Sequence, residues 1–161
     1  LFLLFLSIFA ITKGGYAMEI TSPDFENNTM IPRKFTCQGS DISPNLRIQG
    51  VPSNAKSLAL IVDDPDAPRG NWDHWLVYNI PTSTTTIPEG SIPGLQCVND
   101  SGRQEWGGPC PPSGTHRYFF KVYALDIELP SLPGNARKVD LLNAMQGHIL
   151  EKAELVGLYK K

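Results

Sequence analysis

Two short blocks of the sequence each place a histidine between a rigid loop and an apolar run. The first block reads Asp64-Pro65-Asp66-Ala67-Pro68 and leads to His74. The second begins at Gly107-Gly108-Pro109 and leads to His116 and Tyr118. Loops held still by neighbouring strands are where small binding sites are usually built. We therefore take the two blocks as the first candidates for a functional site.

The residue types in these blocks suit the binding of a small anion. If the two following strands are neighbours, His74 and His116 can converge with at least one carboxylate, from Asp64 or Asp66. A histidine in such a place is either held charged by the carboxylate or serves as a neutral donor. The pattern predicts a pocket for an anion the size of phosphate or acetate.

Backbone groups of the same loops are further candidate donors. Gly107, Gly108 and Ala67 could each direct an N–H toward a ligand, and glycine allows the backbone to approach a ligand closely. A purely structural interpretation stays open, because histidines at strand starts often bond a nearby carbonyl and aspartates beside proline often cap turns. For His148, which has no such block around it, we expect a structural role only.

Other chemistries fit the sequence less well. No pair of candidate ligands has the spacing of a metal site, so we expect no metal and no cofactor. The segment Gly90-Ser91-Ile92-Pro93-Gly94 has its serine in the wrong place for a nucleophile elbow, and no glycine run is followed by Lys-Ser/Thr as in a phosphate-binding loop. We expect a protein that is not an enzyme, with a phosphoester hydrolase as the weakest alternative.

The composition indicates one β-rich domain. The chain has 161 residues, of which 41% are hydrophobic and only 19% charged, together with 14 glycines and 14 prolines. These values suit a single, loop-rich, mainly β domain. The net charge of −2 and the lack of a basic stripe argue against a nucleic-acid partner.

Three apolar runs predict the strands that position the two blocks. They cover residues 57–62, 75–80 and 117–125, and the first two are apolar on both faces, as central strands are. Weaker extended segments are predicted at 20–25, 31–36 and 43–48, and a long loop at 82–94. One C-terminal amphipathic helix is predicted from Asp140 to about Ala153, because apolar residues recur there every four positions.

The N-terminal segment 1–17 is set apart from the domain at 18–161. Residues 1–11 form an apolar run that is too short to span a bilayer but suits a secretory signal, with small residues before Met18. Under this interpretation the mature protein is periplasmic or secreted. If 1–17 is instead upstream sequence outside the true start, we expect a cytoplasmic protein. Neither interpretation includes a transmembrane span.

The three cysteines lack the spacing of a zinc or redox motif. In an exported protein, one disulfide and one free thiol would be the natural count. Cys37 and Cys110 both lie in glycine-containing loops, so they form the predicted pair, and Cys97 would be free. The alternative is that all three are small buried apolar residues.

The two blocks together resemble the phosphatidylethanolamine-binding protein family, also called the Raf kinase inhibitor proteins, and its bacterial and archaeal branch in particular. The resemblance includes the segments 64–68, 74–77, 108–109 and 116–118, with further similarity at 36–44 and 123–126. It covers roughly residues 20–159, nearly all of the predicted mature chain. It implies two antiparallel sheets packed in a β-sandwich-like domain with short helices.

The resemblance also implies a small cavity that binds anions, including phosphate head groups. The matching positions in this chain are Asp64, Asp66, Ala67, Pro68, His74, Gly108, His116 and Tyr118. Family members elsewhere inhibit kinases or serine proteases, so a protein partner contacting the rim of the pocket is the main alternative to a small anion or phosphorylated ligand. Those activities use surfaces outside the shared motifs.

Overall fold

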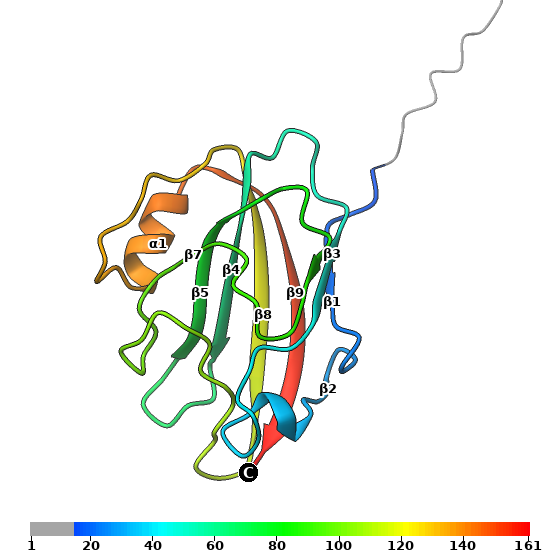
Figure 1. The fold of residues 1–161 in the computed structure, drawn as a ribbon, viewed down its shortest axis with the longest axis vertical. Coiled ribbons are helices and arrows are strands. Elements are labelled where there is room, and N and C mark those ends of the chain that lie inside the picture. The colour runs from blue at the N-terminus through cyan, green and yellow to red at the C-terminus, as the bar shows by residue number, and fades with distance from the viewer. Residues whose placement is uncertain (1–14) are drawn as a thin grey trace, which may run out of the picture.

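The computed structural model describes residues 15–161, which form two β-sheets and one α-helix (Figure 1). The larger sheet has six strands in the order β2-β9-β8-β4-β5-β7, and the smaller has the order β1-β3-β6. The strands are β1 (Glu19–Thr21), β2 (Thr29–Met30), β3 (Leu46–Gln49), β4 (Ser57–Asp64), β5 (Trp72–Ile80), β6 (Thr86–Ile87), β7 (Leu95–Gln96), β8 (Thr115–Leu125) and β9 (Ile149–Lys160). The helices are the 3-10 helix η1 (Arg33–Phe35) and α1 (Lys138–Met145). The predicted mainly β class is confirmed.

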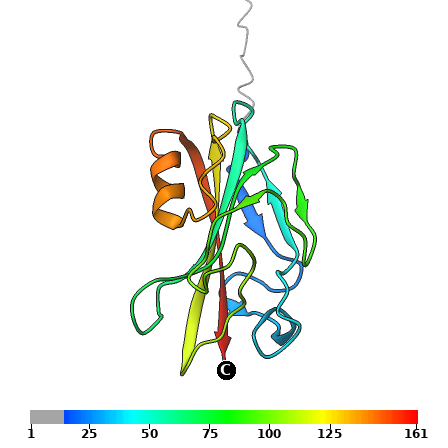
Figure 2. The same cartoon turned by 60° about the vertical axis from the view of Figure 1, so that its left-hand side comes forward.

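The three predicted apolar runs form the centre of the large sheet. β4 is buried at every position and lies between β5 and β8, antiparallel to both. Leu60 and Val62 belong to the core under the small sheet, whereas Ala59 and Ile61 pack on the side of α1. Figure 2 shows this arrangement, with α1 on one side of the large sheet and the small sheet on the other. Burial on both faces explains why β4 is apolar throughout.

The predicted C-terminal helix is wrong in its second half. Helix α1 ends at Met145, and residues 149–160 form β9, which pairs with β8 along its length. Gly147 has a φ of 80°, a conformation that ends the helix, and Ile149 is exposed and not part of an apolar helix face. Asp140 caps α1 from inside its first turn by accepting a bond from the Arg137 N–H. Leu141 and Met145 lie in α1, whereas Ile149 and Ala153 lie in β9. An interval of four residues keeps side chains on one face of a helix and also on one face of a strand, so the spacing alone did not distinguish the two.

Smaller differences occur near the N-terminus. The extended segment predicted at 31–36 contains η1, and the strands predicted at 20–25 and 43–48 are shorter and shifted, as β1 and β3. All the strand pairs are antiparallel except the short edge pair of β2 with β9, which is parallel. Of the proposed leader 1–17, residues 1–14 lie outside the described part of the chain. Among residues 15–161, no helix is long and apolar enough to cross a membrane.

Candidate functional site

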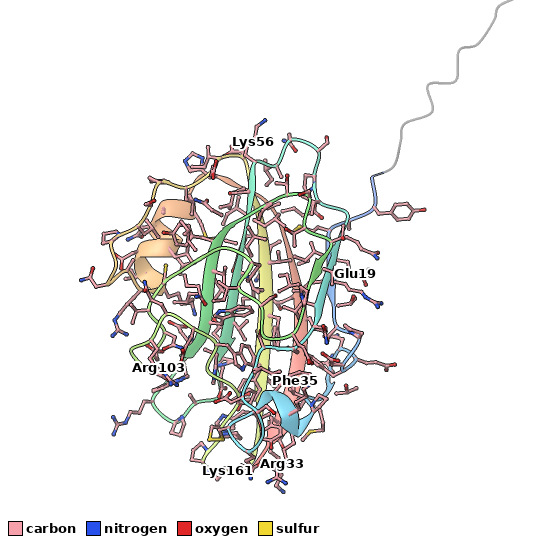
Figure 3. The ribbon with its side chains drawn as sticks, viewed as in Figure 1. Glu19, Arg33, Phe35, Lys56, Arg103 and Lys161 are labelled. Atoms are coloured by element: carbon pink, nitrogen blue, oxygen red, sulfur yellow. A yellow bond between two sulfur atoms is a disulfide. The ribbon has the colours of Figure 1, made fainter. Side chains whose placement is uncertain are left out.

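The predicted site residues gather at one end of the large sheet. β4 ends at Asp64, while β5 and β8 begin nearby, because both run antiparallel to β4. A cavity of about 360 Å³ opens there. Arg103, on its border, lies toward the same end of the molecule as Phe35, far from Lys56 (Figure 3). The cavity is lined by Cys37, Asp41, Asp64, Ala67, Pro68, Trp72, His74, Ser101, Arg103, Gly107, Gly108, Cys110, Pro111, Pro112, His116 and Tyr118.

A β-bulge in β5 turns His74 toward the cavity. Val62 pairs with Trp75, but the next residue, Asp63, pairs with Asp73, so His74 is an extra residue opposite β4. A bulge of this kind bends the strand and re-aims a side chain. The His74 ring consequently packs edge-on against Tyr118, with 5.2 Å between the ring centroids. The hydrophobic pattern of residues 75–80 gives no sign of the extra residue.

Asp64 and His116 form the only buried carboxylate–imidazole pair within residues 15–161 that borders the cavity. His116 Nδ1 lies 2.7 Å from Asp64 Oδ2, and both residues are less than a tenth exposed. The other carboxylate oxygen, Oδ1, accepts the Asp66 backbone N–H at 2.8 Å. Asp64 thus orients His116, as expected for the first of the two aspartates.

His74 is held by a backbone carbonyl. Its Nδ1 lies 2.6 Å from the Gly107 oxygen, and burial lowers the pKa of His74 below its ordinary value, an effect that the Gly107 carbonyl opposes in part. The neutral imidazole is therefore favoured near neutral pH. Burial likewise raises the pKa of Tyr118, which keeps its phenol protonated beside His74.

The structure places Asp66 outside the lining of the cavity. Its carboxylate forms a bidentate pair with Arg117, at 2.9 Å from Nε and 2.8 Å from a terminal nitrogen. The Arg117 hydrogen bonds hold the pKa of Asp66 at about 2. Asp66 thus anchors the 65–71 loop to β8, and it does not contact either histidine as the sequence led us to expect.

The two glycines of the second block do not have free N–H groups. The Gly107 N–H donates to the His74 carbonyl at 3.1 Å, and the Gly108 N–H donates to Asp41 Oδ1 at 2.8 Å. Gly108 is needed for space, because a Cβ there would lie 2.5 Å from the Phe35 carbonyl oxygen. The expected role of these N–H groups as ligand donors is therefore wrong, although both residues line the cavity.

Several residues of the cavity wall lie outside the two blocks. Asp41, Ser101 and Arg103 all border the cavity, as does Trp72, which lies inside the first block. Asp41 has a φ of 54°, and its carboxylate fixes the Gly108 loop. It also borders, with Arg103, a second cavity of about 360 Å³ beside the first. Only the segment 36–44 of the family resemblance could have indicated Asp41.

A disulfide closes one wall of the cavity. Cys37 and Cys110 are joined across a sequence separation of 73 residues, and both are exposed, whereas Cys97 is a buried free thiol. The Cys37 N–H also donates to the Pro109 carbonyl at 3.1 Å. The bond therefore ties the loop after η1 to the loop before β8.

Behind the cavity, a second charge cluster joins α1 to the sheet. Asp63 is 1% exposed; Lys121 Nζ lies 2.9 Å from its Oδ1, and Lys138 Nζ lies 2.5 Å from its Oδ2. Lys138 also contacts Asp73 at 2.9 Å, and burial raises the pKa of Asp73. Because consecutive strand residues point to opposite faces, Asp63 serves this cluster while Asp64 serves the cavity.

Two further predictions concern His148 and the grouping of metal-ligating side chains. His148 bonds the exposed Asp126 at 2.8 Å, at the opposite end of β8, and borders neither cavity. Within the described residues, no three His, Cys, Asp or Glu side chains are grouped so that they could hold a metal ion.

A β-sandwich with a histidine-lined cavity at the ends of its central strands fits the class of ligand-binding β proteins. The chain belongs to the phosphatidylethanolamine-binding protein family, whose family model matches residues 21–160. A UPF0098 protein of Methanothermobacter thermautotrophicus is 49% identical over 154 residues, which are 89% of this chain and 99% of that protein. A UPF0098 protein of Pyrococcus horikoshii is 47% identical over 99% of this chain and 85% of its own length.

Solved structures agree with this placement. A phosphatidylethanolamine-binding protein homologue from Chlamydia trachomatis superposes with a TM-score of 0.87 at 46% identity, covering 90% of this chain and 98% of that one. Escherichia coli YbcL, described as a member of the mammalian family, superposes with a TM-score of 0.82 at 32% identity, covering 89% and 98%.

Proposed function

We propose that this protein binds a small phosphate- or carboxylate-bearing ligand in the cavity at the ends of β4, β5 and β8, without chemical conversion of the ligand. The observation that carries the proposal is the pair of buried imidazoles, His74 and His116, which reach one cavity from two different strands. Buried ionisable groups that converge in a concave site are typical of ligand recognition.

Each neighbouring group has a distinct part in this proposal. Asp64 orients His116, and the Tyr118 hydroxyl supplies a donor that burial keeps protonated. Arg103 borders the opening and adds positive charge, although it also pairs with Glu105 at 2.9 Å. Ala67 and Pro68 line the cavity and give the first loop a fixed shape.

Thermal unfolding in the presence of phosphate, acetate, phosphoethanolamine and phosphotyrosine tests the proposal. A ligand present at 100 times its dissociation constant adds about 2.7 kcal/mol to the free energy of unfolding. We expect an anion-dependent rise in Tm that His116→Ala abolishes. The matched control is His148→Ala, which removes the other aspartate-paired histidine far from the cavity. A rise that survives in His116→Ala would contradict the assignment.

A second candidate function is regulation of a protein partner, such as a kinase or a protease, whose phosphorylated side chain enters the cavity. The observation that favours it is the rim, where Trp72 is 40% exposed and Arg103 lies beside the opening. Tryptophan and arginine are the residue types most enriched in binding hot spots. Replacement of Trp72 by alanine would then weaken binding of a phosphopeptide by a larger factor than it weakens binding of free phosphate.

A further inference from the structure

The lining of the cavity combines carboxylates and imidazoles with neutral side-chain donors from Trp72, Ser101 and Tyr118. The backbone donors Gly107 and Gly108 are bonded to His74 and Asp41. Asp41 and Asp64 contribute two carboxylates, whereas Arg103 is the only lysine or arginine that the described residues 15–161 place in the lining. A site built for a fully deprotonated oxyanion would be expected to have the opposite balance of charge, with cationic donors in excess of carboxylates.

The bond to Gly107 fixes which nitrogen of His74 carries the proton. A carbonyl oxygen can only accept, so Nδ1, at 2.6 Å, must be the donor. In the neutral ring, Nε2 then holds a lone pair. No residue in the described range 15–161 bonds this nitrogen, and it is not among the buried atoms left without a partner, so solvent reaches it. Because His74 borders the cavity, Nε2 is available to a ligand as an acceptor.

The same argument applies to His116. Its Nδ1 donates to the Asp64 carboxylate at 2.7 Å, which leaves Nε2 as an acceptor whenever the ring is neutral. Tyr118 packs against His74 and carries a hydroxyl donor, and the carboxylates of Asp64, Asp73 and Asp63 add negative charge around His74. The cavity therefore offers a ligand one imidazole acceptor at His74 Nε2, and a second at His116 Nε2 whenever that ring is neutral, beside the side-chain donors of the lining.

We propose that this cavity selects oxyanions that carry an O–H of their own, such as hydrogen phosphate or a singly protonated phosphate monoester, over anions of the same shape that carry none. The inference rests on the proposed anion-binding function and names the ligand's protonation state. An O–H on the ligand can donate to the lone pair of His74 Nε2. A sulfate oxygen in the same place has no proton to donate, so its lone pairs would repel the lone pair of Nε2. Sulfate could therefore bind only after His74 has taken a proton from solvent.

Sulfate and phosphate are the matched probes for this proposal. At about pH 8 both are dianions of nearly the same shape, and only phosphate retains a proton. We expect phosphate to bind at least about tenfold more tightly than sulfate at this pH, the difference of about one hydrogen bond. Sulfate binding should strengthen as the pH falls toward 6, while the preference for phosphate narrows.

Calorimetry of the unaltered protein supplies a second readout. Titrations in two buffers of different ionisation enthalpy count the protons taken up on binding. We expect close to one proton for sulfate at about pH 8, and fewer for phosphate. His74→Gln, which offers an amide donor, should reduce the preference for phosphate, whereas His148→Gln should leave it unchanged.

Equal affinity for the two anions without proton uptake would overturn this inference but leave the anion site intact. If neither anion bound at millimolar concentration, the proposed function would fail together with the inference. The proton count does not depend on any variant, so a His74→Gln protein that fails to fold leaves the test in place.

Discussion

His74 and Trp75 are consecutive residues of β5, yet both side chains project from the same face of the large sheet. His74 packs edge-on against Tyr118, and Trp75 packs edge-on against Trp106 at 5.8 Å between ring centroids. Tyr118 and Trp106 both belong to the core under the small sheet. In a regular strand the two side chains would point in opposite directions. The position of His74 beside the cavity therefore depends on the extra residue that β5 has at the register shift between Val62 and Asp63.

The first prediction concerns the pH dependence of stability. Burial lowers the pKa of His74 in the folded state, so below the ordinary value of 6.5 the unfolded chain binds a proton more readily. The contribution of His74 is fully present above this pH and is lost as the pH falls toward its folded pKa. Urea unfolding without anions should show the free energy of unfolding decreasing below pH 6.5, by at most about 1.4 kcal/mol per pH unit from this group.

His74→Gln should make this pH dependence shallower, because the titrating group is removed. The same measurement on His148→Gln, where the imidazole is exposed and paired with Asp126, serves as the control. An unchanged slope in His74→Gln would show that other groups cause the acid sensitivity.

The second prediction compares two adjacent glycines. In Gly108→Ala the new Cβ would meet the Phe35 carbonyl at 2.5 Å, so the wall must move, and we expect a loss of about 1–3 kcal/mol in stability together with weaker anion binding. In Gly107→Ala the nearest atom, Asn99 Nδ2, is 3.5 Å away, an ordinary contact. This variant should differ from the parent by less than about 1 kcal/mol. Similar losses in both would contradict the steric explanation.

The third prediction concerns the disulfide. Cys37–Cys110 closes a segment of 73 residues, and its removal should lower the free energy of unfolding by about 4 kcal/mol on the chain-entropy model. Urea unfolding with and without a dithiol reductant measures the effect. The double variant Cys37→Ser, Cys110→Ser should match the reduced parent and show no further response to the reductant. A reductant effect in that variant would point to another cause.

The fourth prediction concerns the cluster behind the cavity. Asp63→Ala would leave Lys121 and Lys138, each with 22% of its side chain exposed, without their shared counter-ion. We expect a loss of about 3 kcal/mol, partly recovered when Lys138→Met is added. Glu89→Ala removes a single exposed pair with Lys34 and should change stability by less than about 1 kcal/mol. Equal losses would mean that burial of the cluster adds nothing.

The sequence predicted the centre of the fold but not its edges. The runs at 57–62, 75–80 and 117–125 are long and apolar because most side chains of β4, β5 and β8 are buried or half-buried, those of β4 on both faces of the sheet. β9 lies nearer the edge, and its first half is largely exposed, so it has no apolar pattern to distinguish it from the helix before it. Its pairing with β8 is a long-range contact that local periodicity does not report.

For the candidate site, the sequence indicated many of the residues but not their hydrogen-bond partners. Seven of the eight positions indicated by the family resemblance line the cavity, including His74, His116 and Tyr118. The resemblance did not reveal that Asp66 turns away to Arg117, or that the Gly108 N–H is already bonded to Asp41. Hydrogen-bond partners depend on loops far apart in the chain, which residue spacing alone cannot bring together.

The boundary between β4 and β8 divides the large sheet into two halves, one inside and one outside the segment that the disulfide closes. The disulfide encloses β4, β5 and β7, whereas β8 and β9 lie outside the covalent ring. Asp64 and His74 belong to the first half, and His116 and Tyr118 to the second. Under the proposed function, a ligand that contacts residues of both halves would link β4 and β5 to β8. We expect a ligand to slow amide hydrogen exchange along β4 and β8 together, as one cooperative unit. The exchange rate of these amides without ligand would then measure how often the two halves separate.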